Sequence, residues 1–243
     1  IRAACRAYAQ KYVDIHRREF KRLGVLGQWE DPYLTMTAKY EAVIAQAFVD
    51  FLDKGYVYKG LKPVHWCMRC RTALAEAEVE YENHSSPSIW VRFALTSDPA
   101  KIDPALAGRR VYGLIWTTTP WTIPANMAIA YHPKFVYTAV DVAGDVYIVA
   151  EELLQVTAEK CGWTSVNKLA TFNGAVLEGA VFRHPFLERN SGGILADHVT
   201  LEQGTGAVHT APGHGQEDYM IGRQYGINVY CPVDASGRLF HAE

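Results

Sequence analysis

The hydrophobic periodicity of this chain changes once, near residue 62, and this change constrains its fold more than any other feature. Before it, apolar residues recur at three- and four-residue spacing, which is the period of an amphipathic helix. One such stripe begins at Ile1 and stops before Gly24, and a second spans Tyr40 to Leu52. Glycine just beyond a stripe is typical of a helix end. The sequence therefore predicts two helices within residues 1–60.

After residue 62 the period is 2, as in strands that bury one face. Ala77, Val79 and Tyr81 alternate with four glutamates, which we interpret as the wet face of a strand. Many short strands separated by turns favour a closed barrel or a sandwich. We therefore predict an α+β fold, with a helical lead-in over residues 1–60 and a β-barrel-rich domain over 61–243. Further strands are expected at 89–95, 111–117, 136–142, 146–149 and 194–199, and short helices at 151–160 and 217–225.

Composition and charge exclude several classes of protein. Five cysteines are an odd number for a disulfide framework, so we expect a reducing compartment, the cytoplasm. No apolar run is long enough to cross a bilayer, and no membrane partner is expected. The net charge of −2 provides no general attraction to nucleic acid, so RNA would need a local basic patch. The chain does not begin with Met, which suggests a piece of a longer protein. Separately, we expect it to be a monomer.

The first segment that indicates chemistry runs from Leu114 to Pro124, with the sequence LIWTTTPWTIP. An apolar strand ends there in Thr117, Thr118 and Thr119 and is stopped by a proline. Three adjacent hydroxyls can orient a water molecule or stabilise an oxyanion without acting as nucleophiles. The alternative is purely structural, because threonine and tryptophan also suit strands and cores.

The second segment, GTGAVHTAPGHGQEDY, reads as a strand, a glycine-rich loop and the start of a helix near Gln216. We expect Gly213 and Gly215 to adopt backbone conformations that other residues avoid. His209, His214 and Asp218 then lie close together at the junction of loop and helix. A carboxylate there is suited to hold an ammonium group. Equally, Asp218 and its neighbour Glu217 are favourable at any helix N-terminus.

Together, WTTTPWTIPAN and GTGAVHTAPGHGQEDY resemble the paired signature of the isoleucyl-tRNA synthetase editing (CP1) domain, of the bacterial type. The similarity extends over nearly the whole chain, including HWCMRCRTALAEAEVEY. Leucyl and valyl enzymes share this domain, but their first motif typically has a Thr-Thr-Arg-Pro core. Here Pro120 directly follows the three threonines. The resemblance implies proofreading: hydrolysis of the aminoacyl ester of mischarged Val-tRNA(Ile), without a site for aminoacylation.

The resemblance also implies roles for individual residues. Asp218 would hold the α-ammonium of the mischarged amino acid, and His209 would flank the side-chain pocket and exclude isoleucine. Whether His209 also acts as a general base stays open. The ester would be cleaved beside the threonines, and the flanking indoles would be walls or supports. The expected partners are the valine-carrying 3′ end of tRNA(Ile) and the rest of the parent synthetase. The expected site is catalytic Thr117, Thr118, Thr119 and Asp218, with His209, Trp116, Trp121 and Asp218 binding the substrate.

Two alternatives remain at this point. One is a metal-dependent hydrolase that uses His209, His214 and Asp218 as ligands. The other is a non-catalytic tRNA-binding fragment. We expect no cofactor, although Cys67 and Cys70 form a CxxC, half of a possible zinc site. A structural zinc site normally needs four protein ligands, and the second pair is missing from the sequence.

Overall fold

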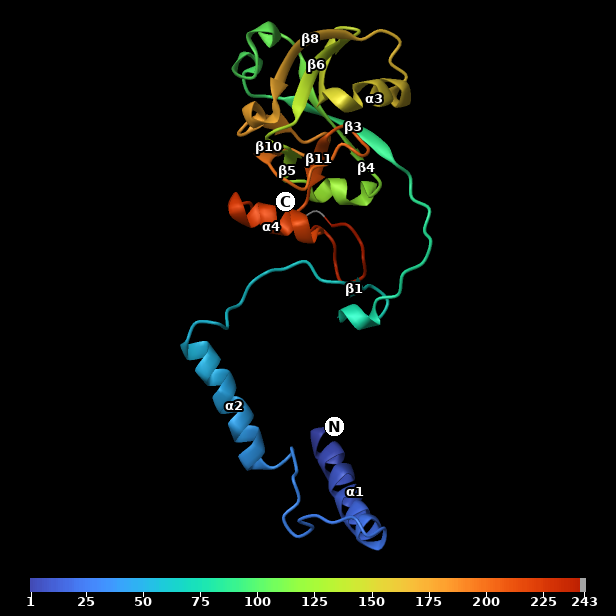
Figure 1. Ribbon diagram of the computed structural model, residues 1–243, viewed down its shortest axis with the longest axis vertical. Helices are drawn as coiled ribbons and strands as arrows, with labels where there is room; N and C mark the ends of the chain where they lie inside the picture. Colours follow the sequence, from blue (N-terminus) through green and yellow to red (C-terminus); the bar gives the residue numbers. More distant parts are fainter. Residues whose placement is uncertain (241–243) are drawn as a thin grey trace. The chain divides into compact units, whose positions relative to one another are not determined.

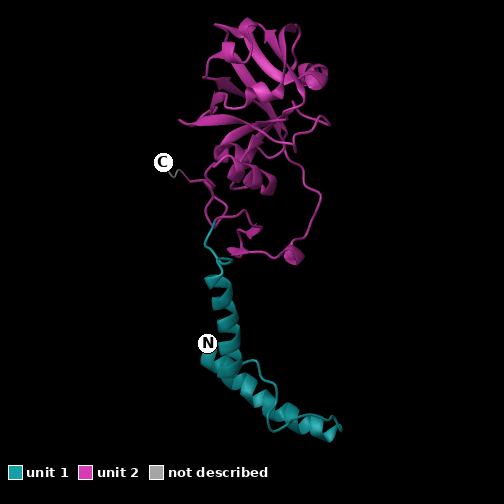
Figure 2. Cartoon of the chain, turned by 60° about the vertical axis from the view of Figure 1, so that its left-hand side comes forward, with its two compact units in different colours: residues 1–60 teal, residues 61–243 magenta. Residues whose placement is uncertain are grey.

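The computed structural model describes residues 1–240 and divides into two compact units, Ile1–Gly60 and Leu61–Glu243 (Figure 2). No helix within the described residues is both long and apolar enough to span a membrane. Each unit is built from the type of element that its hydrophobic period predicts, helices in the first and mainly strands in the second.

Unit Ile1–Gly60 consists of two helices, α1 (Arg2–Arg22) and α2 (Ala38–Asp53). The Thr37 side chain caps α2 by accepting a hydrogen bond from the backbone N–H of Tyr40. Arg6 links the two segments, since its guanidinium lies 3.0 Å from the Glu41 carboxylate. Neither helix has a buried residue, so local hydrogen bonds and caps hold this unit together more than a core does.

The second unit contains a nine-stranded mixed sheet in the order β11-β5-β10-β9-β3-β4-β7-β6-β8 (Figure 1). Two neighbouring pairs, β4 with β7 and β5 with β10, are parallel, and the other pairs are antiparallel. The strands are β3 (Ile89–Leu95), β4 (Val111–Thr117), β5 (Ala128–Tyr131), β6 (Val136–Val142), β7 (Asp145–Ala150), β8 (Asn167–Asn173), β9 (Val181–Arg183), β10 (Asn190–Leu195) and β11 (Ala207–Thr210).

The sheet curls so that the loop before β11 reaches β4. The Thr205 hydroxyl donates to the Leu114 carbonyl at 2.6 Å, and the Thr205 carbonyl accepts from the Ala150 N–H at 2.8 Å. The enclosed core includes fully buried Phe93, Ile115 and Phe182. A second, smaller apolar cluster lies between the sheet and α4 (Gln216–Gln224). The remaining α-helix, α3 (Leu154–Cys161), ends at Gly162 in the left-handed conformation.

Two expected strands differ in the structure. The alternating segment around Val79 forms a 3-10 turn, η1 (Glu76–Glu78), and then an irregular segment, because no strand within residues 1–240 pairs with it. The strand expected at 194–199 lies earlier, as β10. It includes Gly193, where a side chain has no room because a β-carbon would lie 2.3 Å from the Leu177 carbonyl oxygen. A short hairpin, β1 (Trp66–Cys67) with β2 (Thr72–Ala73), precedes the large sheet.

Candidate active site

The three threonines form a tight turn where β4 ends. The backbone N–H of Thr119 donates to the Thr117 hydroxyl at 3.0 Å, which holds the turn closed. Thr118 lies at its exposed tip, and its carbonyl accepts from the Ser86 hydroxyl at 2.7 Å. Pro120 then begins the 3-10 helix η4 (Pro120–Ala125), where its lack of an N–H costs no hydrogen bond.

The second stretch leaves the sheet at β11 and turns into α4. The Asp218 carboxylate accepts the Ala211 N–H at 2.8 Å, which ties the start of the helix back to the loop. Gly213 and Gly215 do not have positive φ, so the expectation of a special backbone conformation is wrong. Position 213 requires a glycine for lack of space instead, because a β-carbon there would lie 2.3 Å from the Tyr230 carbonyl oxygen.

The fold brings these two distant stretches together. His209 on β11 lies 2.8 Å from the hydroxyl of Thr122 on η4, measured from Nε2 to Oγ1. The rings of Trp121 and His214 meet edge to face, with centroids 5.2 Å apart and planes at 87°. The threonine turn, η4 and the loop before α4 therefore form one continuous surface.

Hydrogen bonds around His209 determine which of its nitrogens carries the proton. The Asn126 amide nitrogen donates to the Ala128 carbonyl at 2.8 Å and also lies 2.9 Å from His209 Nδ1, which must accept. The proton of the neutral ring is therefore on Nε2 and is donated to Thr122. The Thr122 hydroxyl in turn donates to the Thr119 carbonyl at 2.8 Å. Both ring nitrogens of His209 are thus engaged.

Burial keeps the His209 ring neutral. Only 8% of the residue is exposed, and this desolvation lowers its pKa from 6.5 to about 4, with smaller contributions from nearby His184 and His214. At neutral pH the ring is uncharged and has no free lone pair with which to take a proton from water. The ring is thus fixed in place and does not fit the role of a general base.

Asp218 has a different electrostatic environment. Desolvation raises the pKa of its carboxyl above the ordinary 3.8, while the hydrogen bond from the Ala211 N–H acts in the opposite direction. A partly desolvated carboxylate gains more from a cation beside it than an exposed one does. The site is therefore suited to an ammonium group.

The two flanking tryptophans lie in different places. Trp116 on β4 pairs with Trp90 on β3, with ring centroids 6.4 Å apart, and it packs over Gly204. Side chains alternate along a strand, so Trp116 faces away from the side that Ile115 and Thr117 share. Trp121 is 55% exposed and is the indole beside His214. Only Trp121 borders the surface formed by the two stretches.

The sequence did not single out three residues of this site. Thr122, Asn126 and Ser191 are buried and connect η4 to β10 and β11 through side-chain hydrogen bonds. Their partners are far away in sequence, so no local spacing marks them. The one available signal was that Thr122 and Asn126 lie inside the first motif.

The candidate metal ligands do not converge. Within residues 1–240, no three His, Cys, Asp or Glu side chains are placed to share a metal ion. His209 uses both ring nitrogens for hydrogen bonds, so it does not fit the ligand set of the metal-dependent alternative. Cys67 and Cys70 are close, and the Cys70 N–H donates to Cys67 Sγ at 3.3 Å, but two thiols make only half of a structural site.

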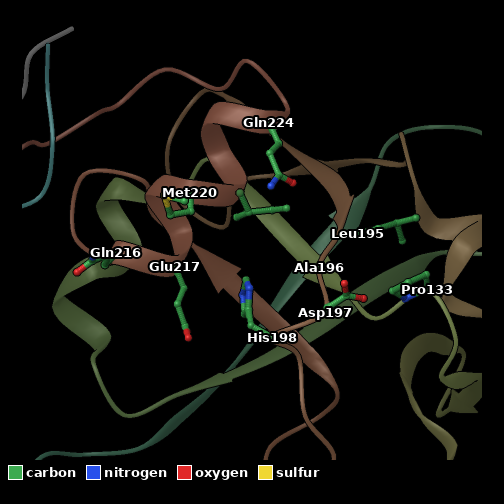
Figure 3. A pocket seen from close by; sticks show the side chains of 10 residues that line it. Pro133, Leu195, Ala196, Asp197, His198, Gln216, Glu217, Met220 and Gln224 are labelled. Carbon is green, nitrogen blue, oxygen red and sulfur yellow. The ribbon is translucent and has the colours of Figure 1, made fainter. Parts of the chain in front are cut away.

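A separate depression of about 440 Å³ lies along α4 (Figure 3). Side chains of α4, including Glu217 and Met220, face the segment that follows β10, which includes Asp197 and His198. None of the expected site residues lines it. The depression is thus distinct from the surface formed by the threonine turn and the His209–Asp218 loop.

Comparison with known proteins gives consistent matches. Residues 1–206 match the family model of the class I tRNA synthetases (I, L, M and V). The chain is 52% identical over 236 residues to the isoleucine–tRNA ligase of Desulfotalea psychrophila, covering 97% of this chain and 25% of that protein. It is 51% identical over 241 residues to that of Syntrophotalea carbinolica, covering 99% and 26%. The chain thus spans about a quarter of the length of these relatives.

Among solved structures, "The crystal structure of GlLeuRS-CP1" matches with a TM-score of 0.49 and 21% identity, over 59% of this chain and 66% of that one. The resemblance to isoleucyl enzymes that the two motifs carry is confirmed by the curated relatives. Because the family model covers most of its length, this chain belongs to the class I tRNA synthetases of the I, L, M and V group.

Proposed function

We propose that this chain hydrolyses the ester between valine and the 3′ end of tRNA(Ile), as the editing part of a longer synthetase. One observation carries the proposal: the threonine turn and the His209–Asp218 loop, far apart in sequence, lie against each other, joined by the His209–Thr122 hydrogen bond. Membership of a tRNA synthetase family and isoleucine–tRNA ligases as relatives support the choice of substrate.

In this proposal Asp218 binds the α-ammonium of the amino acid. Its Oδ2 is held by the Ala211 N–H, which orients the carboxylate for a charge-assisted hydrogen bond. An ammonium beside the carboxylate offsets the desolvation that raises the pKa of Asp218. The amino acid is thereby anchored at one end and placed with its ester toward the threonine turn.

The threonines position the attacking water. Thr118 is the exposed member of the three, whereas the Thr117 hydroxyl is used to close the turn. The water oxygen bonds to the ester carbonyl carbon, the bond to the ribose oxygen breaks, and that oxygen takes up the proton that water releases. Orientation of this kind lowers the barrier without a protein base, and the His209 ring has no free lone pair to serve as one.

His209 restricts the size of the amino acid. Its ring is held at both nitrogens, so it forms a wall that cannot move aside for a larger side chain. Valine lacks one methylene of isoleucine, a difference worth about 1–3 kcal/mol in a hydrophobic pocket, for which isoleucyl-tRNA synthetase is itself a standard example. A second pocket that accepts valine and rejects isoleucine by size adds to that small discrimination.

Deacylation of Val-tRNA(Ile) by the 243-residue chain tests the proposal. We expect release of valine by the parent chain and its loss in an Asp218→Ala variant. Glu217→Ala is the matched control, since it removes the neighbouring carboxylate of the same helix, which faces the depression along α4. Full turnover by Asp218→Ala would contradict the role of this residue. Binding of the tRNA without turnover by the parent chain would instead favour a non-catalytic fragment.

A further inference from the structure

A buried row of polar groups connects β10 to the threonine turn. The Ser191 hydroxyl on β10 donates to Asn126 Oδ1, and the Asn126 amide nitrogen donates to His209 Nδ1. From there the row continues through Thr122 to the Thr119 carbonyl. We call these five residues the polar row. Ser191 and Asn126 are both fully buried, so water does not replace the hydrogen bond between them.

Ser191 and the Ala128 carbonyl together determine which way the Asn126 amide faces. The two ends of an amide side chain have nearly the same shape but opposite hydrogen-bonding roles. The Ala128 carbonyl can only accept and so requires the amide nitrogen on its side, at 2.8 Å. The Ser191 hydroxyl donates to the oxygen on the other side. Without that hydroxyl, the Asn126 oxygen is a buried acceptor without a partner, and it gains by turning toward another donor.

The orientation of the amide matters at His209. An amide nitrogen facing Nδ1 holds the neutral ring with its proton on Nε2 and aimed at Thr122. An amide oxygen in that place would require the proton on Nδ1, and His209 would then accept from the Thr122 hydroxyl. The Thr122 hydroxyl would no longer donate to the Thr119 carbonyl, which it now meets at 2.8 Å. The amide orientation that Ser191 helps to hold thus sets the direction of every later hydrogen bond in the polar row.

We propose that Ser191 is a positioning residue for the editing site: through Asn126 it holds His209 as the Nε2–H tautomer in one ring orientation. The kinetic part of this inference rests on the proposed function, and the tautomer part does not. Ser191 does not touch the surface formed by Trp121, His214 and the threonine turn through any hydrogen bond of its own in the described residues. Its effect reaches the substrate only through the His209 wall.

Nitrogen NMR of the histidine ring tests this directly. In the chain labelled with ¹⁵N-histidine, His209 signals are assigned by their loss in His209→Gln. We expect the parent chain to show an unprotonated Nδ1 and a protonated Nε2 at neutral pH. Ser191→Ala should show a mixture of tautomers or exchange broadening. Thr138→Val is the control, because it removes another buried hydroxyl hydrogen bond, to the Ala170 carbonyl, away from this site.

Kinetics supply the second readout. Ser191→Ala should reduce the preference for Val-tRNA(Ile) over Ile-tRNA(Ile) about five- to tenfold, the worth of one hydrogen bond, while Thr138→Val keeps the parental ratio. A parental His209 tautomer in Ser191→Ala would overturn the inference, whatever the activity. A parent chain that leaves Val-tRNA(Ile) intact would contradict the proposed function instead, and the NMR result would still decide the role of Ser191.

Discussion

The buried neutral His209 makes the stability of this domain dependent on pH. Its pKa is about 4 in the folded chain, against an ordinary value of 6.5. Below pH 6.5 the unfolded chain therefore binds a proton that the folded chain refuses, and the free energy of unfolding falls as the pH falls. Between pH 7.5 and pH 5 this single group removes about 2 kcal/mol of stability. The full loss, reached below pH 4, is about 3 kcal/mol.

Urea denaturation followed by tryptophan fluorescence at pH 7.5, 6 and 5 measures this loss. The buried His184 and the partly buried His214 also have lowered pKa values and contribute in the same direction. The raised pKa of Asp218 acts in the opposite direction, because its carboxyl takes up a proton more readily in the folded chain, and this effect is common to the parent and the variant. The His209→Gln variant has no titratable group at this position. Between pH 7.5 and pH 5 its free energy of unfolding should therefore fall by about 2 kcal/mol less than that of the parent.

His84→Gln is the matched control, because His84 is exposed. The free energy of unfolding of this variant should depend on pH in the same way as that of the parent. Absolute stability is not the readout, since His209→Gln also removes the acceptor for the Asn126 amide. If His209→Gln and the parent lose equal stability between pH 7.5 and pH 5, the His209 ring is protonated in the folded chain. His209 would then not be the neutral ring, hydrogen-bonded at both nitrogens, that the proposed pocket requires.

Three further predictions concern space, hydrogen bonds and metal. Gly213→Ala should destabilise the domain by about 1–3 kcal/mol in urea, because the new methyl group meets the Tyr230 carbonyl oxygen; an unchanged midpoint would show that the loop moves freely. Tyr137→Phe should cost a similar amount, about 1–3 kcal/mol, since the buried hydroxyl donates to the Gly206 carbonyl and accepts from the His132 N–H; wild-type stability would mean that neither bond contributes. Treatment with EDTA should leave deacylation of Val-tRNA(Ile) unchanged, and inhibition that zinc reverses would revive the metal-dependent alternative.

Periodicity located several strands at their observed bounds, including Ile89–Leu95, Val111–Thr117 and Val136–Val142. These strands alternate or are uniformly apolar and lie between clear turn signals, so local sequence determines them. The segment around Val79 has the same alternation, but a strand also needs a neighbour to pair with, and periodicity does not report that. β5 (Ala128–Tyr131) was missed because a buried strand of four residues has no alternation.

In the candidate site, too, local sequence motifs could be predicted, whereas contacts between residues far apart in the sequence could not. The two motifs could be recognised from local sequence, and the structure brings them together through His209 and Thr122. The orientation of the His209 ring could not be predicted from the sequence. It depends on the hydrogen bond between Ser191 and Asn126, two residues that only the folded sheet brings together. Gly213 is required for another reason than the predicted backbone conformation: the Tyr230 carbonyl approaches so closely that a β-carbon has no room.

The parallel pairing of β5 with β10 has a consequence for how the domain is made. Thr122 and Asn126 leave the ribosome well before the strands that carry Ser191 and His209, and β5 has no partner until β10 and then β11 arrive. Pairings between strands so distant in sequence form slowly, because a long loop must close first. The newly made chain therefore leaves η4, the second half of its first motif, unprotected until its last strands are complete, and hydrogen exchange in η4 should become slow only when it does in β10 and β11.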